Sequence, residues 1–195
     1  MALAALAKKT DWKKSREFIV RQQSGLFFAG KLTAYLNADR LVASLDAKPM
    51  ALDPILWDIL DLPENSQMPL SFRAMGAFTC HALTMAEADL EYGGLSPDAV
   101  ALTFMEFIER AALQTHESLR RQSFTEQLLA HPNQVDGGAY AITLVASQIN
   151  DGQYKQAAEL SQGYASGRLS SRLQMISLNK SFHEHAMAWL ATKTQ

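Results

Sequence analysis

The stretch FIVRQQSGLFFAGKL, residues 18–32, decides which fold the sequence predicts. Two short apolar runs lie on either side of Ser24-Gly25, a dipeptide that favours a turn. Because short apolar runs do not distinguish a buried helix from a strand, the stretch admits either a β-hairpin around Ser24-Gly25 or helical structure. We prefer helix here, since stop and start signals typical of helices punctuate the chain.

Capping residues and helical spacing predict helices along the rest of the chain. Ser96-Pro97 has a capping hydroxyl before a proline at the first helical position, and Ser123 with Glu126 has the spacing of a capping box. The predicted helices span about residues 11–23, 26–45, 52–62, 71–92, 97–121, 123–132, 138–150, 153–165 and 170–192. The sequence therefore predicts a single all-α domain, a bundle of about seven to nine helices with short loops, in which residues 1–10 form a flexible tail.

One predicted helix pair resembles a known repeat. The run AITLVASQINDGQYKQAAELSQGYAS resembles one helical hairpin of the tetratricopeptide type, with Gly152, Tyr154 and Ala157 at the turn between the helices. A stacked array needs several such units, and the sequence contains no second copy at the expected interval. We interpret the run as a generic antiparallel helix pair.

The composition narrows the classes of function. The 18 basic and 20 acidic side chains nearly cancel, so nucleic-acid binding by the whole molecule is not expected. A lone cysteine, Cys80, excludes an internal disulfide and the paired thiolates of a structural zinc site, which favours a cytoplasmic protein. The apolar run near the start is too short for a signal peptide, and no stretch is long enough to insert into a membrane.

Charge is unevenly distributed along the chain. Residues 1–21 carry six basic against two acidic side chains, a net charge of +4. Residues 46–109 carry eleven acidic against two basic side chains, a net charge of −9. A solvated acidic face explains such a segment most simply, and the sharper interpretation is a binding surface for a basic protein partner.

The segment LDPILWDILDLP, residues 52–63, is the strongest candidate for the binding site of that partner. Asp53 suits a helix cap, and a helical wheel places Trp57 between Asp53 and Asp61, on the acidic side with Asp58. A tryptophan among carboxylates is typical of an interface anchor. The sequence therefore predicts a partner-binding site of Trp57, Asp53, Asp58 and Asp61, with the alternative that the loop ENSQMPL folds back over Trp57.

The segment HEH, residues 183–185, raises the question of a metal site. On a helix His183 and His185 project about 200° apart, so they do not chelate one ion. The wheel of residues 170–192 instead places His183 inside the apolar arc, with Asn179 one turn earlier. We expect a buried Asn179–His183 pair whose polar groups satisfy one another, or alternatively a ligand pocket that these two residues line.

No catalytic or metal-binding template fits the sequence. It contains no metalloprotease, calcium-loop, P-loop or nucleophile-elbow motif, and Glu109 with His116 lie two turns apart on a predicted helix face. We therefore expect no cofactor and favour a small binding protein, such as an adaptor, an inhibitor or an immunity-type factor, that acts through its acidic segment. The alternative is an enzyme or small-ligand module with an inter-helix pocket near His183.

Overall fold

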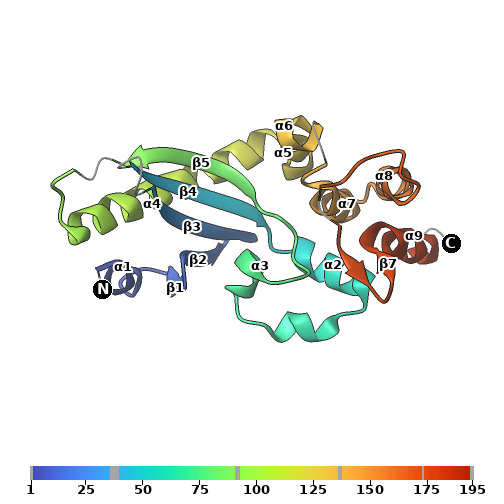
Figure 1. Ribbon diagram of the computed structural model, residues 1–195, viewed down its shortest axis with the longest axis horizontal. Coiled ribbons are helices and arrows are strands. Elements are labelled where there is room, and N and C mark those ends of the chain that lie inside the picture. The colour runs from blue at the N-terminus through green and yellow to red at the C-terminus, as the bar shows by residue number, and fades with distance from the viewer. Residues whose placement is uncertain (1, 36–39, 91–92, 136–137, 173, 194–195) are drawn as a thin grey trace. The chain divides into compact units, whose positions relative to one another are not determined.

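The structure is a computed structural model that describes residues 2–35, 40–90, 93–135, 138–172 and 174–193 (Figure 1). The chain divides into two compact units, which are described separately. The sheet unit consists of Met1–Pro49 and Ala82–Arg121, and the helical unit of Met50–His81 and Gln122–Gln195. The predicted all-α bundle is wrong, because the described chain contains a five-stranded antiparallel sheet as well as helices.

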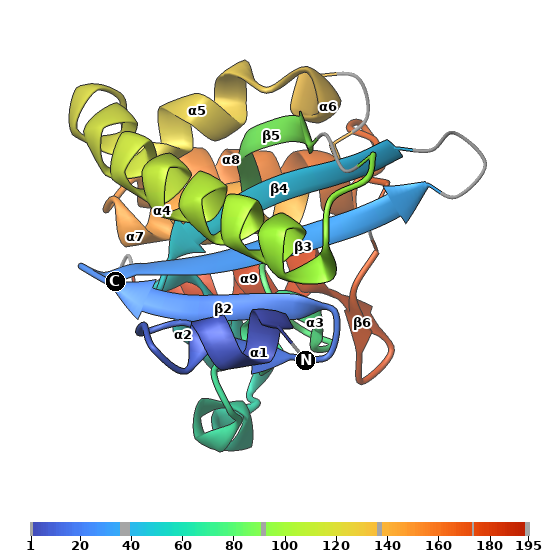
Figure 2. The ribbon, with the colours of Figure 1, turned by 90° about the vertical axis from the view of Figure 1, so that its left-hand side faces the viewer.

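The sheet unit has two helices on one side of its sheet. Its elements are α1 (Ala2–Ala7), β1 (Lys13–Ser15), β2 (Phe18–Gln23), β3 (Leu26–Tyr35), β4 (Arg40–Pro49), β5 (Leu83–Leu90) and α4 (Pro97–Arg121). Neighbouring strands follow chain order β1 to β5 and are all antiparallel. Figure 2 shows α4 running across the sheet with α1 beside it. The predicted flexible tail thus contains a helix, whose Ala7 is buried in the core under α4.

Residues 18–32 form a β-hairpin, so the prediction of a helix over these residues is wrong. Ser24 and Gly25 adopt left-handed φ angles of 49° and 77°, and Gln23 pairs with Leu26. Such angles at both central residues suit a two-residue hairpin turn. The residues of β3 from Leu26 to Gly30 are all buried, so both faces of this strand are covered and the polar–apolar alternation that identifies a half-buried strand is missing.

The helix predicted over residues 71–92 is also wrong. Over residues 71–90, the part of this segment that the structure describes, a short helix, α3 (Phe72–Met75), is followed by strand β5. The sequence of β5, LTMAEADL, consists largely of residues that favour helix, but pairing with β4 overrides this preference. Thr84, Glu87 and Asp89 are exposed along it, as expected for an edge strand.

Helix α4 forms where it is predicted and packs closely on the sheet. Phe104 and Ile108 of α4 share a core cluster with Phe28 and Leu45 of the sheet. Gly30 faces the helix, and a Cβ atom at this position would lie 3.1 Å from Ile108 Cγ2. The absent side chain at Gly30 therefore permits the close approach of helix and strand.

A buried arginine ties α4 to the strands. Arg21 is 7% exposed, and its Nη1 donates to Glu109 Oε2 at 2.9 Å and to Oε1 at 3.1 Å. Trp12 Nε1 donates to the same carboxylate at 2.8 Å, and the Arg21 guanidinium lies 4.4 Å from the Trp12 ring centre. Glu109 therefore satisfies two donors from distant parts of the chain and belongs to the core framework of the unit.

The helical unit contains the remaining elements. They are α2 (Leu52–Leu60), the 3₁₀ helix η2 (Pro63–Gln67), α3, α5 (Phe124–Ala130), α6 (Pro132–Val135), α7 (Ala141–Asn150), α8 (Tyr154–Ala165), β6 (Ile176–Ser177), β7 (Lys180–Ser181) and α9 (Phe182–Lys193). The predicted capping box of Ser123 and Glu126 is confirmed, and α8 packs against both α7 and α9. The last helix begins at Phe182 rather than near residue 170, because the β6–β7 hairpin precedes it.

Among the described residues, none of the helices combines the length and the apolar character that crossing a bilayer requires.

Replacing Glu109 tests how much the Arg21–Glu109 ion pair stabilises the protein. Glu109→Gln should lower the free energy of unfolding by about 1–2 kcal/mol, because it leaves the Arg21 cation buried beside a neutral amide. The loss is smaller than for a fully buried pair, since the Glu109 side chain is 41% exposed. Urea denaturation measures it, with the exposed Glu106→Gln as the control on the same helix. Equal unfolding midpoints for the two variants would show that the Arg21–Glu109 ion pair does not stabilise the protein.

Candidate functional site

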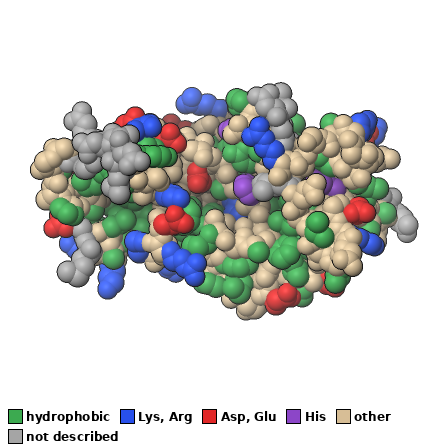
Figure 3. Space-filling model, in the orientation of Figure 1, with side chains coloured by type: hydrophobic (Ala, Val, Ile, Leu, Met, Phe, Trp, Pro, Cys, Tyr) green, Lys and Arg blue, Asp and Glu red, His purple; other side chains and the backbone are tan. Residues whose placement is uncertain are grey.

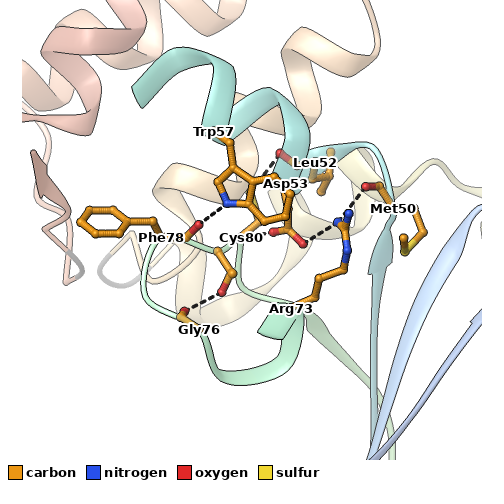
Figure 4. A network of polar contacts seen from close by, with 9 residues as sticks. Met50, Leu52, Asp53, Trp57, Arg73, Gly76, Phe78 and Cys80 are labelled. Carbon is orange, nitrogen blue, oxygen red and sulfur yellow. Dashed lines mark hydrogen bonds and ion pairs between the residues drawn. The ribbon is translucent and has the colours of Figure 1, made fainter. Parts of the chain in front are cut away.

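The structure places Trp57 inside the helical unit rather than on its surface (Figure 4). The side chain is 3% exposed, and its Nε1 donates to the carbonyl oxygen of Phe78 at 2.7 Å. The Phe72 ring and the Arg73 guanidinium lie 6.4 Å and 5.0 Å from the indole centre. Residues 72–78 therefore cover the indole, further along the chain than the expected loop ENSQMPL, and Trp57 is not the exposed anchor that the sequence suggested.

Asp53 is likewise occupied within the fold. It is fully buried, and its carboxylate accepts from Arg73 Nη1 at 2.9 Å and from the Cys80 backbone N–H at 2.8 Å. Arg73 Nη1 also donates to the Met50 carbonyl, and the Cys80 thiol donates to that of Leu52 (Figure 4). A buried carboxylate held by a cation and an N–H group is a structural element, because a partner would have to break both bonds.

Two of the four predicted partner-binding residues remain on the surface. Asp58 and Asp61 are exposed, although Asp58 Oδ2 accepts a hydrogen bond from Trp189 Nε1 at 2.8 Å. Asp61 ends α2 with a left-handed φ of 55°. The two carboxylates lie at a hollow of about 220 Å³, which is also lined by Pro54, Trp57, Pro63 and Ser66.

The acidic segment as a whole does not form a free acidic face. Asp89 forms an ion pair with Arg40 between β5 and β4. Glu109 is paired with Arg21, and Asp53 is engaged as described above. Figure 3 shows acidic side chains with basic side chains close beside them in several places on the face drawn. The net charge of −9 over residues 46–109 is therefore partly neutralised by cations from elsewhere in the sequence.

His183 lies in the first turn of α9 and is 6% exposed, so its predicted burial is confirmed. The predicted buried pair with Asn179 is wrong, because Asn179 is exposed and occupies the β6–β7 turn with a left-handed φ of 62°. The two residues nevertheless line one hollow of about 510 Å³, which we call the His183 pocket. Its walls come from the end of α8, residues 167, 169–171 and 174–176, the β6–β7 turn and the start of α9.

The His183 ring packs among aromatic side chains and has no polar partner. It stacks on Tyr164 with ring centres 4.6 Å apart and planes 23° apart, and it meets Phe182 at 5.3 Å and 75°. Neither ring nitrogen has a hydrogen-bond partner among the described residues. Burial lowers the pKa of His183 to about 4, so the ring is neutral near pH 7 and offers one donor and one acceptor nitrogen.

The rest of the pocket wall combines apolar and polar side chains and carries little charge. Ser170, Gln174 and Asn179 are exposed side chains of its wall. Among the described residues of the wall, Glu184 is the one that carries a charge. Its Oε2 accepts from the Ser181 N–H at 2.7 Å and from the Ser181 hydroxyl at 2.8 Å. The backbone hydrogen bond from Ser181 is the main reason that the pKa of Glu184 is lowered. Glu184 therefore stays ionised and caps α9.

The structure separates the two histidines of the HEH segment. His185 Nε2 lies 2.9 Å from the Ser177 carbonyl oxygen, whereas His183 stacks on Tyr164. Across the described residues, no group of three or more His, Cys, Asp or Glu side chains is arranged to hold a metal ion. Since no described hydroxyl or thiol bonds a His183 nitrogen, the ring also has no nucleophile to activate there.

Sequence reasoning named His183 and Asn179 as possible pocket residues but missed Tyr164. Tyr164 comes from another helix, and no local pattern indicates that its ring stacks on His183. The loop before β6 does carry a signal, because Ser166-Gly167 and Ser170-Ser171 are typical of a break in helix. That signal argued against a helix that starts near residue 170.

The geometry defines a class of site rather than a reaction. A hollow with aromatic side chains in its wall and a few polar groups at its rim is typical of small-molecule binding. Comparisons with protein-family models, curated proteins and solved structures gave no match to the chain.

The lowered pKa of His183 predicts a pH-dependent stability. Between pH 6.5 and about 4, the unfolded chain takes up a proton that folded His183 does not, so the free energy of unfolding falls as the pH falls through this range. From pH 7 to pH 5 the loss due to His183 is about 2 kcal/mol. Urea denaturation at both pH values measures this fall in the free energy of unfolding. The fall should be about 2 kcal/mol smaller in His183→Phe than in the wild type, and it should be unchanged in His185→Gln. An identical loss in the wild type and His183→Phe would refute the assignment.

Proposed function

We propose that the protein binds an uncharged small molecule in the His183 pocket. The observation that carries this proposal is His183 itself, a histidine that is 6% exposed, lines a hollow and has no partner for either ring nitrogen among the described residues. Buried polar groups are nearly always hydrogen-bonded, and an exception in a hollow needs an explanation. A ligand that bonds the imidazole after a small movement of the wall supplies one.

The size and the wall of the pocket suit such a ligand. A volume of about 510 Å³ lies within the range of small-molecule sites. Tyr164 and Phe182 supply apolar surface, and Gln174 and Asn179 supply amide groups at the rim. A compact molecule with a flat apolar part and several hydrogen-bonding groups would use both kinds of surface.

The charges of the wall support an uncharged ligand. No lysine or arginine is among the described residues that line the pocket, and Glu184 is its one charged side chain. A phosphate or carboxylate would lose hydration there without gaining a counter-ion. The proposal concerns binding alone, and it assigns no catalytic residue.

Matched pairs of compounds test the proposal. Thermal-shift and isothermal titration measurements with adenosine against AMP, and with glucose against glucose 6-phosphate, should show that binding is confined to uncharged members. The double variant Gln174→Ala/Asn179→Gly should weaken that binding about tenfold, as expected for two lost hydrogen bonds, and glycine keeps the left-handed turn. Lys180→Gln, in the same hairpin but outside the pocket wall, is the matched control.

Two results would count against this function. A library of uncharged metabolites that contains these compounds and yields no binder would remove the proposal. Binding that survives both the double variant and His183→Phe would place the ligand elsewhere on the protein.

A second candidate function is the binding of a basic protein partner through Asp58 and Asp61. The specific observation is that both carboxylates are exposed at one hollow between prolines Pro54 and Pro63. This candidate keeps the adaptor or inhibitor role expected from the acidic segment, without Trp57 and Asp53. The cytoplasmic location expected from the single cysteine remains a prediction that would accompany either function.

The second candidate predicts a charge-dependent complex. Asp58→Asn/Asp61→Asn should abolish capture of a basic protein from the native host at low salt, whereas Glu159→Gln, an exposed acid on α8, should not. The captured protein is then purified, and its affinity should fall as salt rises. Equal capture by both variants would dismiss the acidic site.

A further inference from the structure

A second hollow lies entirely within the sheet unit and is separate from the His183 pocket. It has a volume of about 540 Å³ and lies between the β2–β3 hairpin turn and the last turns of α4. The hairpin contributes Gln23, Ser24 and Leu26 to its wall, and α4 contributes residues between Leu113 and Arg120. Nothing in the proposed function uses these residues.

His116 is the first unusual group in this wall. Its ring meets Phe28 edge-on, with centres 5.4 Å apart. Its Nε2 atom is shielded from solvent and has no hydrogen-bond partner among the described residues. Burial lowers the pKa of His116, and the charges of Arg120 and Arg21 lower it further. The ring is therefore neutral near pH 7 and is held so partly by neighbouring cations.

Arg120 is the second unusual group. It is exposed, it lines the hollow, and within the described ranges no carboxylate lies at ion-pair distance from it. The other cation that acts on His116, Arg21, is already neutralised by Glu109 at 2.9 Å. Glu117 is the one acidic side chain of the wall. The wall thus offers a guanidinium that is free to bind an anion.

The third feature is apolar surface next to this cation. Leu113 is 63% exposed, and Leu26 and Leu119 belong to the same wall. A planar guanidinium binds a carboxylate through two parallel hydrogen bonds, and neighbouring leucines favour an alkyl group. A dianion such as a phosphate monoester fits less well, because Glu117 repels its second charge.

We propose that this hollow binds a small monocarboxylate with an apolar tail. Arg120 pairs with the carboxylate, and the tail lies along Leu113 and Leu26. A small movement of the wall brings the shielded His116 Nε2 into hydrogen-bond distance of the same carboxylate. The bound anion also offsets the repulsion between Arg120 and protonated His116, so binding strengthens as the pH falls toward the pKa of His116 and is accompanied by proton uptake.

Hexanoate and its neutral isostere hexanamide are the probes. In the full-length protein, hexanoate in the millimolar range should shift the imidazole NMR signals of His116 and raise its measured pKa, whereas hexanamide should do neither. Arg120→Gln should weaken hexanoate binding at least tenfold. Arg121→Gln, a basic neighbour outside the wall, is the matched control and should leave it unchanged.

The tail is tested separately. Leu113→Ser replaces an exposed side chain, and it should weaken binding of hexanoate more than binding of acetate. Circular dichroism checks that each variant is folded. The proposal is overturned if hexanoate causes no change at His116, if hexanamide binds as well as hexanoate, or if Arg121→Gln weakens binding as much as Arg120→Gln.

Discussion

The hairpin turn at Ser24 and Gly25 is the constraint on which the sheet unit depends. With both residues left-handed, the turn pairs Gln23 with Leu26 and so sets the register of β2 on β3. Side chains alternate between the two faces of a sheet, so a slip of one residue would turn Ile19 and Phe28 away from α4. The core under α4, the close approach at Gly30 and the Arg21–Glu109 pair all require this register.

In the helical unit, the buried carboxylate of Asp53 has a comparable role. A buried charge is stable only when it is paired and hydrogen-bonded. Arg73 and the Cys80 N–H, which lie 20 and 27 residues further along the chain, meet this requirement. The segment that contains these two residues also brings the Phe78 carbonyl to Trp57. The pairing of the Asp53 carboxylate therefore explains why both Asp53 and Trp57 are buried and absent from the expected partner-binding surface.

The two hollows contain the same residue type in different surroundings. His183 is neutral because burial among aromatic rings removes its hydration, and the described residues of its pocket wall include no basic side chain. His116 is neutral because burial acts together with two nearby arginines. The first setting favours uncharged ligands and the second favours anions, so the surroundings of each imidazole rather than the imidazole itself select the chemistry.

The sequence by itself determined the elements whose signals are local. Helix α4 and the capping box of Ser123 and Glu126 depend on residues within a few positions of one another, and the burial of His183 also followed from the helical periodicity of its neighbours. Only the tertiary structure decided between helix and strand over residues 18–32 and 71–92, because pairing between strands overrides local preference there. The same holds for the sites. The stacking of Tyr164 on His183 and the burial of Trp57 depend on contacts between segments distant in sequence, which no local pattern encodes.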